Sequence, residues 1–356
     1  SATHEESTSE QKSKLITARG SSIRSINGNT SLKAGKKLNI IGSSVLANED
    51  TGTVLLDGDE VNILAAKNTL EQSSNSNSKF AKINLISSAQ DYIPTVGEEQ
   101  NKSKTTATTH QNSFIGGAKV TIKSKEDTNI KGGLVLAKEV DASGVEGDLN
   151  IESLQDTYTS DSNSVGVSIG GNTGMHAGKD TADTAWVNQQ SGLIGTEKVV
   201  VNAKTLRTKG GIIANIKEDG TDGGNLQITA EKIEHEDVYD YDNSKSKGFG
   251  LSVTMRNKEG SGPEAGSTKF NFKDKYTNKE QTTGATIGNG QVTTTKQGTK
   301  ELVGLNRDIT KTQENTKDES GGVSFSGEFD NRYLADPGKA LAEDVQAVTE
   351  LPGNVV

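Results

Sequence analysis

The amino-acid sequence predicts an all-β fold: a right-handed parallel β-helix (β-solenoid) with projecting hairpins or loops and a short C-terminal helix. Three observations predict it. A short two-strand phrase returns along the chain, glycines stand between its strands, and only 30% of the 356 residues are hydrophobic. A globular domain of this length would carry nearer half apolar residues, whereas a narrow solenoid needs few in each coil.

The phrase is clearest in two copies at an offset of 23 residues, SLKAGKKLNI at 31–40 and VLLDGDEVNI at 54–63. Apolar residues alternate with polar ones within each copy, which is the pattern of a strand with one buried face. Direct alignment of the copies places Leu32 opposite Leu55. The two copies therefore predict two strands that stack in register.

Later copies extend the pattern at 120–137 and 199–214, with partner strands at 148–151 and 225–228. The residues expected to point into a shared core are Leu32, Leu38, Ile40, Leu55, Val61, Ile63, Ile122, Ile130, Val135, Leu149, Ile151, Val201, Ile213, Leu226 and Ile228. The glycines expected at turns are Gly35, Gly42, Gly58, Gly132 and Gly210. Glycine supplies a positive φ at no steric cost, and we expect it to do so at Gly35 and Gly58, between the paired strands.

A longer module of roughly 80 residues is superimposed on these copies. After each pair of strands comes a Ser/Asn-rich stretch and then a Gly-rich alternating strand, as at 165–170 and 248–253. We expect these strands to form hairpins or extra strands that project from the rod or pair on its side. The segments 92–112, 172–188 and 256–282 are expected to loop out.

Domain boundaries follow from the change of pattern near residue 330. Residues 1–330 are predicted to form the repeat solenoid, and 331–356 a helical tail. The predicted modules are about 15–110, 111–190, 191–282 and 283–330. Asp336 can cap the tail helix, with Pro337 at its first position.

Stacking stabilises such repeats because one unit cannot bury its own apolar face. Stacked asparagines can also hydrogen-bond from coil to coil. The candidates for this ladder are Asn39, Asn62, Asn129 and Asn150. The alternative is that they are ordinary exposed turn residues.

Composition excludes several classes of function. The chain has no cysteine, so it has no disulfide and no thiolate site. Its formal net charge of −9 argues against nucleic acid as a partner. No apolar run approaches the ~20 residues of a transmembrane helix.

No metal, cofactor or catalytic site is expected. The four histidines, at 4, 110, 176 and 235, lack the spacing of metal or protease motifs. Acidic clusters at 57–60 and 234–242 could bind Ca²⁺, although their spacing fits no calcium loop and solvated turns are the alternative. Trp186, with Val187, is expected to anchor a loop on the rod; stacking on carbohydrate is the other possibility.

An enzyme is the competing hypothesis, because parallel β-helices also house polysaccharide lyases and hydrolases. Such enzymes need clustered Asp, Arg or Lys on one face of consecutive coils. Here the charged residues are expected to scatter over turns, and arginine is rare. We therefore expect a structural segment and no catalysis.

The phrases at 32–47 and 54–69 resemble the haemagglutinin repeats of filamentous-haemagglutinin-type exoproteins, the large passengers of two-partner secretion in Gram-negative bacteria. The stretch 305–344 resembles the end of the second repeat region in contact-dependent growth inhibition toxins. This resemblance implies a secreted β-helical filament at the cell surface. It also implies export by an outer-membrane two-partner-secretion transporter that acts on an amino-terminal domain outside this chain.

The function implied is that of a structural stalk segment that assists contact-dependent delivery of a C-terminal toxin across the target outer membrane. The alternative is an adhesin or haemagglutinin filament that binds host or bacterial surfaces. In either case the partner is a target-cell surface or outer membrane. Since the chain is expected to be an internal piece, secretion and toxicity are properties of its parent protein.

Overall fold

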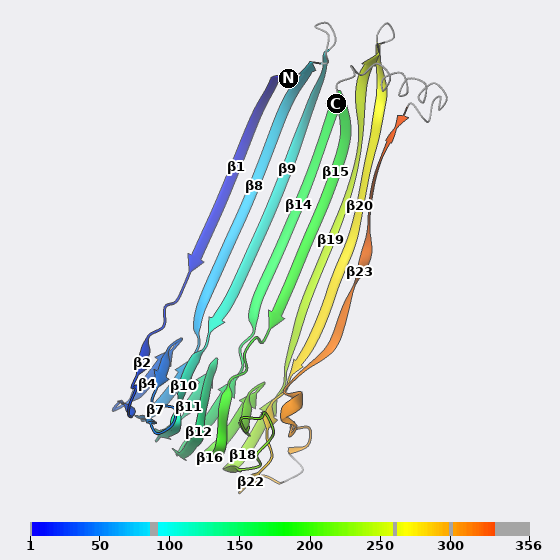
Figure 1. Ribbon diagram of the computed structural model, residues 1–356. Coiled ribbons are helices and arrows are strands. Elements are labelled where there is room, and N and C mark those ends of the chain that lie inside the picture. Colours follow the sequence, from blue (N-terminus) through cyan, green and yellow to red (C-terminus); the bar gives the residue numbers. More distant parts are fainter. Residues whose placement is uncertain (1, 86–91, 259–261, 299–301, 332–356) are drawn as a thin grey trace, which may run out of the picture.

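The computed structural model describes residues 2–85, 92–258, 262–298 and 302–331. It has two parts, a stack of short strands and a sheet of long strands that rises from the stack (Figure 1). The short strands pair in parallel, so the predicted β-solenoid fold with projecting hairpins is confirmed. Among the residues described, no helix has the length and apolar character needed to cross a membrane.

Each coil of the solenoid contributes to three parallel faces. The strands are β2 (Ser22–Arg24), β3 (Thr30–Lys33), β4 (Lys37–Ile41), β5 (Ser44–Leu46), β6 (Thr53–Gly58), β7 (Glu60–Leu64), β10 (Ser113–Ser124), β11 (Thr128–Lys131), β12 (Gly133–Val145), β13 (Leu149–Glu152), β16 (Gly192–Lys209), β17 (Ile212–Asn215), β18 (Leu226–Glu236), β21 (Thr286–Ile287) and β22 (Gln291–Thr294). The first face pairs β2, β5, β10, β12, β16, β17 and β21. The second pairs β3, β6, β10, β12, β16, β18 and β22. The third pairs β4, β7, β11, β13, β16 and β18.

The core is a column of aliphatic side chains inside these faces. On the third face Ile63 pairs with Ile130, and Ile130 with Ile151, and all three are at most 1% exposed. Complete burial of one such side chain contributes about 2 kcal/mol. Near the C-terminal end, Leu302 and Leu305 pack against the core beside the 3-10 helix η2 (Ile309–Lys311).

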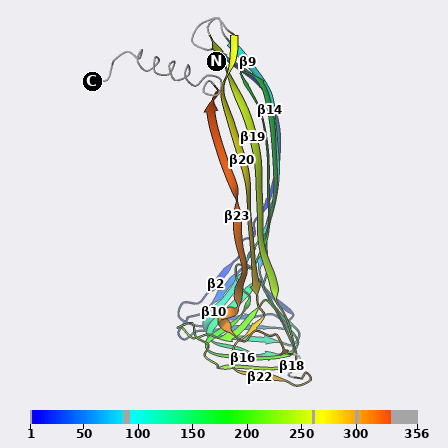
Figure 2. The ribbon, with the colours of Figure 1, turned by 90° about the vertical axis from the view of Figure 1, so that its right-hand side faces the viewer.

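The long strands form one eight-stranded antiparallel sheet in the order β1-β8-β9-β14-β15-β19-β20-β23. Their bounds are β1 (Ala2–Ile16), β8 (Ala66–Leu85), β9 (Tyr92–Gln111), β14 (Asp156–Gly170), β15 (Asn172–Trp186), β19 (Val238–Lys258), β20 (Gly262–Thr283) and β23 (Gln313–Asp330). Seen from the side, the sheet is a single curved layer that stands on the solenoid (Figure 2).

Hairpins and coils alternate in a fixed ratio. Two coils, β2–β4 and β5–β7, precede the hairpin β8–β9; two more precede β14–β15, and another two precede β19–β20. Neighbouring strands lie ~4.8 Å apart in either kind of sheet. Two coils therefore lengthen the solenoid by the same ~9.6 Å by which one hairpin widens the long sheet.

Three sequence-based expectations need correction, and the first concerns the segments 92–112, 172–188 and 256–282, which were expected to loop out. Their described residues lie mainly in the return strands β9, β15 and β20. Their polar composition hid strands whose hydrogen bonds, rather than a core, hold them in place. The structure also shows that much of 1–330 lies in the antiparallel sheet. The predicted helical tail, 331–356, lies outside the described residues apart from Asn331.

The alignment of Leu32 with Leu55 is wrong by one residue. Leu32 pairs with Leu56. The pairing shifts because two residues separate Asp57 from Glu60, whereas three separate their partners Lys33 and Lys37. A shift of one residue exchanges the two faces of a strand. Leu55 is accordingly only half-buried, while Val54 and Leu56 fill the core.

The glycines that adopt a positive φ are not the two for which it was expected. It is absent at Gly35 and Gly58, whereas Gly42, Gly132 and Gly210 have φ of 54°, 66° and 56°. Each of these three glycines comes directly after a third-face strand, where the first coil of a pair ends and the second coil begins. The foot of a hairpin lies against each of them, so a Cβ there would collide with a neighbouring strand.

Candidate functional site

The long sheet has two faces of different chemistry, set by the alternation of side chains along each strand. On one face, antiparallel register brings Val167, Met175 and Leu251 side by side, followed by Phe270. We call this the apolar face. We define it by the exposed Val, Ile, Leu, Met and Phe side chains of strands β9 to β23 on this side, which are Val96, Val165, Val167, Ile169, Met175, Phe249, Leu251, Phe272, Val323, Phe325 and Phe329.

Aromatic packing ties the β20 edge of the apolar face together. The rings of Phe272 and Phe325 stack with centroids 5.2 Å apart, and Phe270 meets Phe325 at 6.1 Å in a tilted arrangement. Such pairs add about 0.5–1.5 kcal/mol to the burial of their area. Even so, Phe325 remains 51% exposed. The face is therefore ordered and open to solvent.

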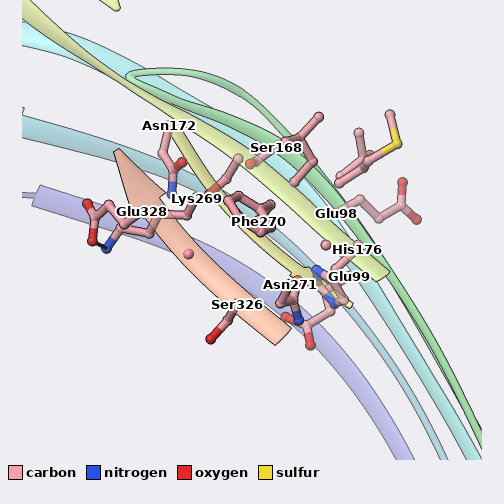
Figure 3. A pocket seen from close by; sticks show the side chains of 18 of the residues that line it. Glu98, Glu99, Ser168, Asn172, His176, Lys269, Phe270, Asn271, Ser326 and Glu328 are labelled. Carbon is pink, nitrogen blue, oxygen red and sulfur yellow. Dashed lines mark ion pairs between the residues drawn. The ribbon is translucent and has the colours of Figure 1, made fainter. Parts of the chain in front are cut away.

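The opposite face is polar and rich in glycine and serine. Its far end, the end remote from the solenoid, holds a groove of about 650 Å³. Glu99, Asn172, His176 and Asn271 line it (Figure 3), and they come from three strands of the sheet, β9, β15 and β20. Hydroxyl, amide and charged groups of this kind suit a polar ligand. Lys269 and Glu328 at the rim neutralise one another across 3.3 Å.

Rings lie over glycines on neighbouring strands in this sheet. Phe80 pairs with Gly97, where an added Cβ would lie 2.5 Å from the ring, and His176 covers Gly166 in the same way. Shielding a glycine by a cross-strand ring favours one register over its neighbours. These pairs help fix the alignment of strands that carry few large side chains.

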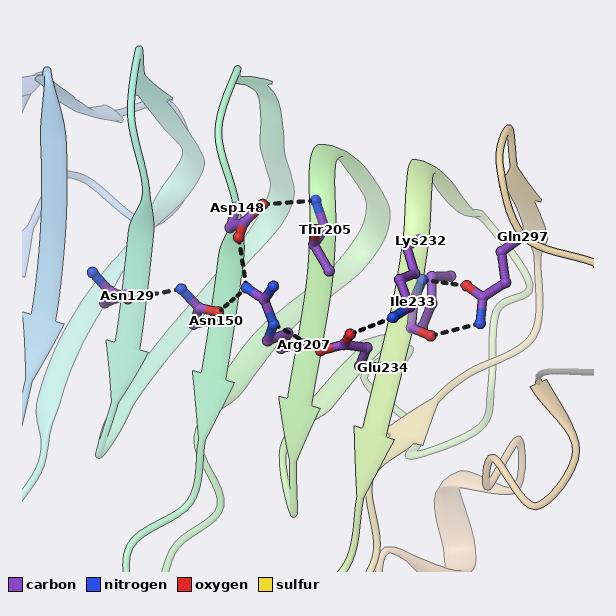
Figure 4. A network of polar contacts seen from close by, with 9 residues as sticks. All are labelled: Asn129, Asp148, Asn150, Thr205, Arg207, Lys232, Ile233, Glu234 and Gln297. Carbon is purple, nitrogen blue, oxygen red and sulfur yellow. Dashed lines mark hydrogen bonds and ion pairs between the residues drawn. The ribbon is translucent and has the colours of Figure 1, made fainter.

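The solenoid's third face carries a polar ladder (Figure 4). Asn62 donates to Asn39 over 2.8 Å, Asn129 to Asn62 over 2.8 Å, and Asn150 to Asn129 over 2.9 Å. All four asparagines lie within strands, not at turns. The four asparagines therefore form the expected ladder and are not turn residues.

Arg207 continues the ladder with charge. Its Nη1 donates to Asp148 Oδ2 over 2.6 Å and to Asn150 Oδ1 over 3.3 Å, and its Nε donates to Glu234 over 2.7 Å. Hydrogen bonds from Lys232 and then Arg207 hold the pKa of Glu234 below its usual value. Burial opposes the same effect at Asp148, where the bonds from Arg207 and Thr205 nevertheless lower the pKa.

This network corrects the expectation that charged residues scatter over turns. Acidic and basic side chains gather on one face of consecutive coils, and they do so as cross-coil pairs. Lys131 meets Glu152 at 3.2 Å, and Lys209 meets Glu236 at 3.0 Å. These ion pairs therefore connect neighbouring coils.

The junction between the solenoid and the sheet, which we call the neck, is a further polar cluster. Asp240, 2% exposed, accepts bonds from Gln155 Nε2 at 2.8 Å, Gln281 Nε2 at 2.9 Å and Thr283 Oγ1 at 2.6 Å. It also accepts from the backbone N–H of Val187 at 3.1 Å. A buried carboxylate with four donors is satisfied, and it fixes the feet of two hairpins.

The predicted core residues take the following positions. Those buried in the core are Ile40, Val61, Ile63, Ile122, Ile130, Val135, Leu149, Ile151, Val201, Ile213, Leu226 and Ile228. Leu32 and Leu38, in the first coil, are partly buried and pack against it. Val187 is 1% exposed beside Trp186, which ends β15.

The four histidines lie on four different strands. His4, His110, His176 and His235 belong to β1, β9, β15 and β18. His110 Nδ1 meets Asp156 Oδ1 at 3.1 Å near the foot of β9. Within the described ranges, no group of three or more His, Asp or Glu side chains is placed to hold a metal ion.

Sequence reasoning missed the apolar face and the neck. The signal for the apolar face is visible in the alternation of Val165, Val167 and Ile169, and again in Phe270 and Phe272. What no local pattern revealed is that each hairpin pairs with the next across the intervening coils, β9 with β14 and β15 with β19. The neck gave no signal, because single Gln and Ser residues carry no periodicity.

These coils, with their stacked aliphatic and asparagine columns, define a repetitive β-solenoid protein. Residues 1–167 match the family model described as Hemagglutinin repeat. This match supports a protein of the filamentous-haemagglutinin type. Proteins with this repeat are typically secreted surface proteins, in the general context of two-partner secretion. Comparison with curated proteins and with solved structures returned no match.

Proposed function

We propose that this chain is a structural stalk segment of a secreted exoprotein and assists contact-dependent delivery of a C-terminal toxin across the target outer membrane. Export through an outer-membrane two-partner-secretion transporter and contact with a target-cell surface are parts of this proposal. The haemagglutinin repeat supports the secreted stalk or adhesin. Delivery rests on the likeness of 305–344 to toxin-carrying exoproteins.

One observation carries the proposal: the core and the exposed apolar side chains lie in different parts of the molecule. The core cluster belongs to solenoid strands, from Ile40 to Ile287. The apolar face belongs to the far half of the projecting sheet, and Figure 1 shows that sheet rising from the solenoid. A stalk needs a stable spine and a surface held away from it, and this arrangement supplies both.

We also propose that the chain is not an enzyme. The charges on the third face of the solenoid are the nearest approach to a catalytic cluster. Arg207 there is engaged by two carboxylates, and the adjacent lysines have carboxylate partners of their own. Degradation of a uronate or other glycan by the purified chain would contradict this.

The test is deletion of residues 1–330 from the parent protein, scored separately for binding to target cells and for toxin entry. Loss of toxin entry with cell contact retained is the expected result. Removing residues 113–191, two coils with their hairpin, provides the matched control, because it shortens the stalk and keeps its architecture. Toxin entry that persists without 1–330 would contradict a role in delivery.

An adhesin is the second candidate, favoured by the open apolar face and the polar groove behind it. In that case deletion of 1–330 abolishes cell contact itself. The same pair of measurements therefore separates the two functions.

A further inference from the structure

The apolar face is too large to be an ordinary exposed surface. Its eleven side chains range from 37% exposed at Phe272 to 64% exposed at Ile169. At about 90 Å² each they amount to roughly 1,000 Å² of apolar side chain, whereas the largest patch on a typical monomer is about 300–600 Å². A sheet with one apolar face is stable when a second layer covers that face.

The area matches what a stable interface between two proteins requires. Standard interfaces bury about 800 Å² on each partner, so this face suffices for a lasting contact. Its side chains are mainly Val and Phe on a curved pleated surface (Figure 2). Such a surface packs on a second sheet at a separation of about 10 Å, with inner side chains interdigitated.

The charges around the face show how a partner sheet would be placed. Toward the solenoid, the same side of the sheet carries Lys102, Lys179 and Lys247, the last paired with Asp274 at 3.4 Å. Toward β1 it carries Lys79 and Glu98. Glu98 pairs with Val167, so these two charges flank the apolar row. A partner that covered the whole side would bury all of these groups, so only the far half of β14, β15, β19, β20 and β23 can be covered.

A second copy of this chain meets these conditions. Its own apolar face has the same extent and the same polar margin. Two copies that overlap only on the far half of these five strands leave the lysines in water and keep the two solenoids apart. A self-complementary patch of this kind forms an isologous contact about a two-fold axis.

We propose that two copies of the chain associate apolar face to apolar face, forming a two-layered sandwich at the ends of their projecting sheets. Met175 and Leu251, on adjacent central strands of the face, lie close to the axis of this dimer. The interaction goes beyond the stalk function, since it joins two stalks side by side.

The test uses sedimentation equilibrium of the purified chain between about 1 and 100 µM. The chain is expected to be a dimer, and Leu251→Lys to weaken the dimer at least tenfold by placing a charge in the interface. Ser252→Lys is the matched control, because the neighbouring residue faces the opposite side, and it should leave the affinity unchanged. A wild-type chain that is monomeric at 100 µM, or a Leu251→Lys dimer as tight as wild type, overturns the proposal.

Cross-linking provides a second measurement that does not depend on a charged variant folding. The chain has no cysteine, so Met175→Cys introduces a single thiol on the apolar face. Mild oxidation should give a disulfide-linked dimer with Met175→Cys and not with Ser252→Cys. Equal cross-linking of both, or binding of the wild-type monomer to phosphatidylcholine vesicles without self-association, overturns the dimer.

Discussion

Replacing Gly132 with alanine should destabilise the solenoid markedly. The residue has a φ of 66°, a conformation that costs a non-glycine residue about 1–2 kcal/mol. The new Cβ would also collide with Ala65 Cβ and lie 2.9 Å from Leu154 Cδ1 and 3.0 Å from Asn112 Oδ1. Overpacking of this kind costs about 1–3 kcal/mol. Together the two effects predict a loss of about 2–5 kcal/mol in the free energy of unfolding.

The matched control is Gly35→Ala. This glycine has no positive φ and nothing within 4 Å of an added Cβ, so its free energy of unfolding should change by less than about 0.5 kcal/mol. Urea unfolding followed by circular dichroism compares the two variants. Hydrogen exchange in β11, which ends just before Gly132, localises the effect. Equal stability of the two variants would refute the idea that the first coil of a pair needs glycine to pass the hairpin foot.

Three further predictions concern the ladder, pH and the ratio of coils to hairpins. Asn129→Ala removes two ladder bonds, of 2.8 and 2.9 Å, and should lower the free energy of unfolding by about 1–2 kcal/mol, measured by urea titration; an unchanged midpoint would mean that the ladder adds nothing. The cationic partners of Glu234 lower its pKa in the folded state, so the stability that Glu234 contributes is present above pH 4.5 and is lost as pH falls below that value. The melting temperature should therefore be lower at pH 3 than at pH 6, and Glu234→Gln should reduce this difference. Deleting 113–132, one coil, should destabilise the chain more than deleting 113–191, two coils and a hairpin, although it removes fewer residues; thermal melts in the reverse order would contradict the geometric match between the two sheets.

The solenoid was predictable from sequence because its strands repeat a local pattern. Alternating apolar residues mark its buried faces, and asparagines at equal positions of successive copies mark the ladder. The error at Leu55 shows the limit of this reasoning. A turn shortened by one residue leaves the apolar pattern intact but exchanges the two faces of the strand. In the run VLL, either the first and third residues or the second residue can point inward, and no local signal distinguishes the two arrangements.

The long sheet was only half predictable. Gly-rich alternating strands indicated hairpins. Their return strands were interpreted as loops, since the Gly, Asn, Asp, Glu and Lys in them are poor strand formers by intrinsic preference. Those residues form strands here because each has a neighbour already held in place by the solenoid. These strands form because modules pair with one another, and the propensity of a single segment carries no information on such pairing.

The two parts of the molecule depend on each other through a shared spacing. A single antiparallel layer with one open apolar face has little core of its own, and isolated hairpins are marginal in water. The solenoid anchors the base of each hairpin at intervals of two coils, ~9.6 Å, which is the width of one hairpin. Every long strand therefore starts next to the strand with which it pairs. Stability then resides in buried columns such as Ile63, Ile130 and Ile151, and the sheet is free to carry side chains selected for contact. This division explains how a chain with few hydrophobic residues can leave eleven of them exposed on one face and still fold.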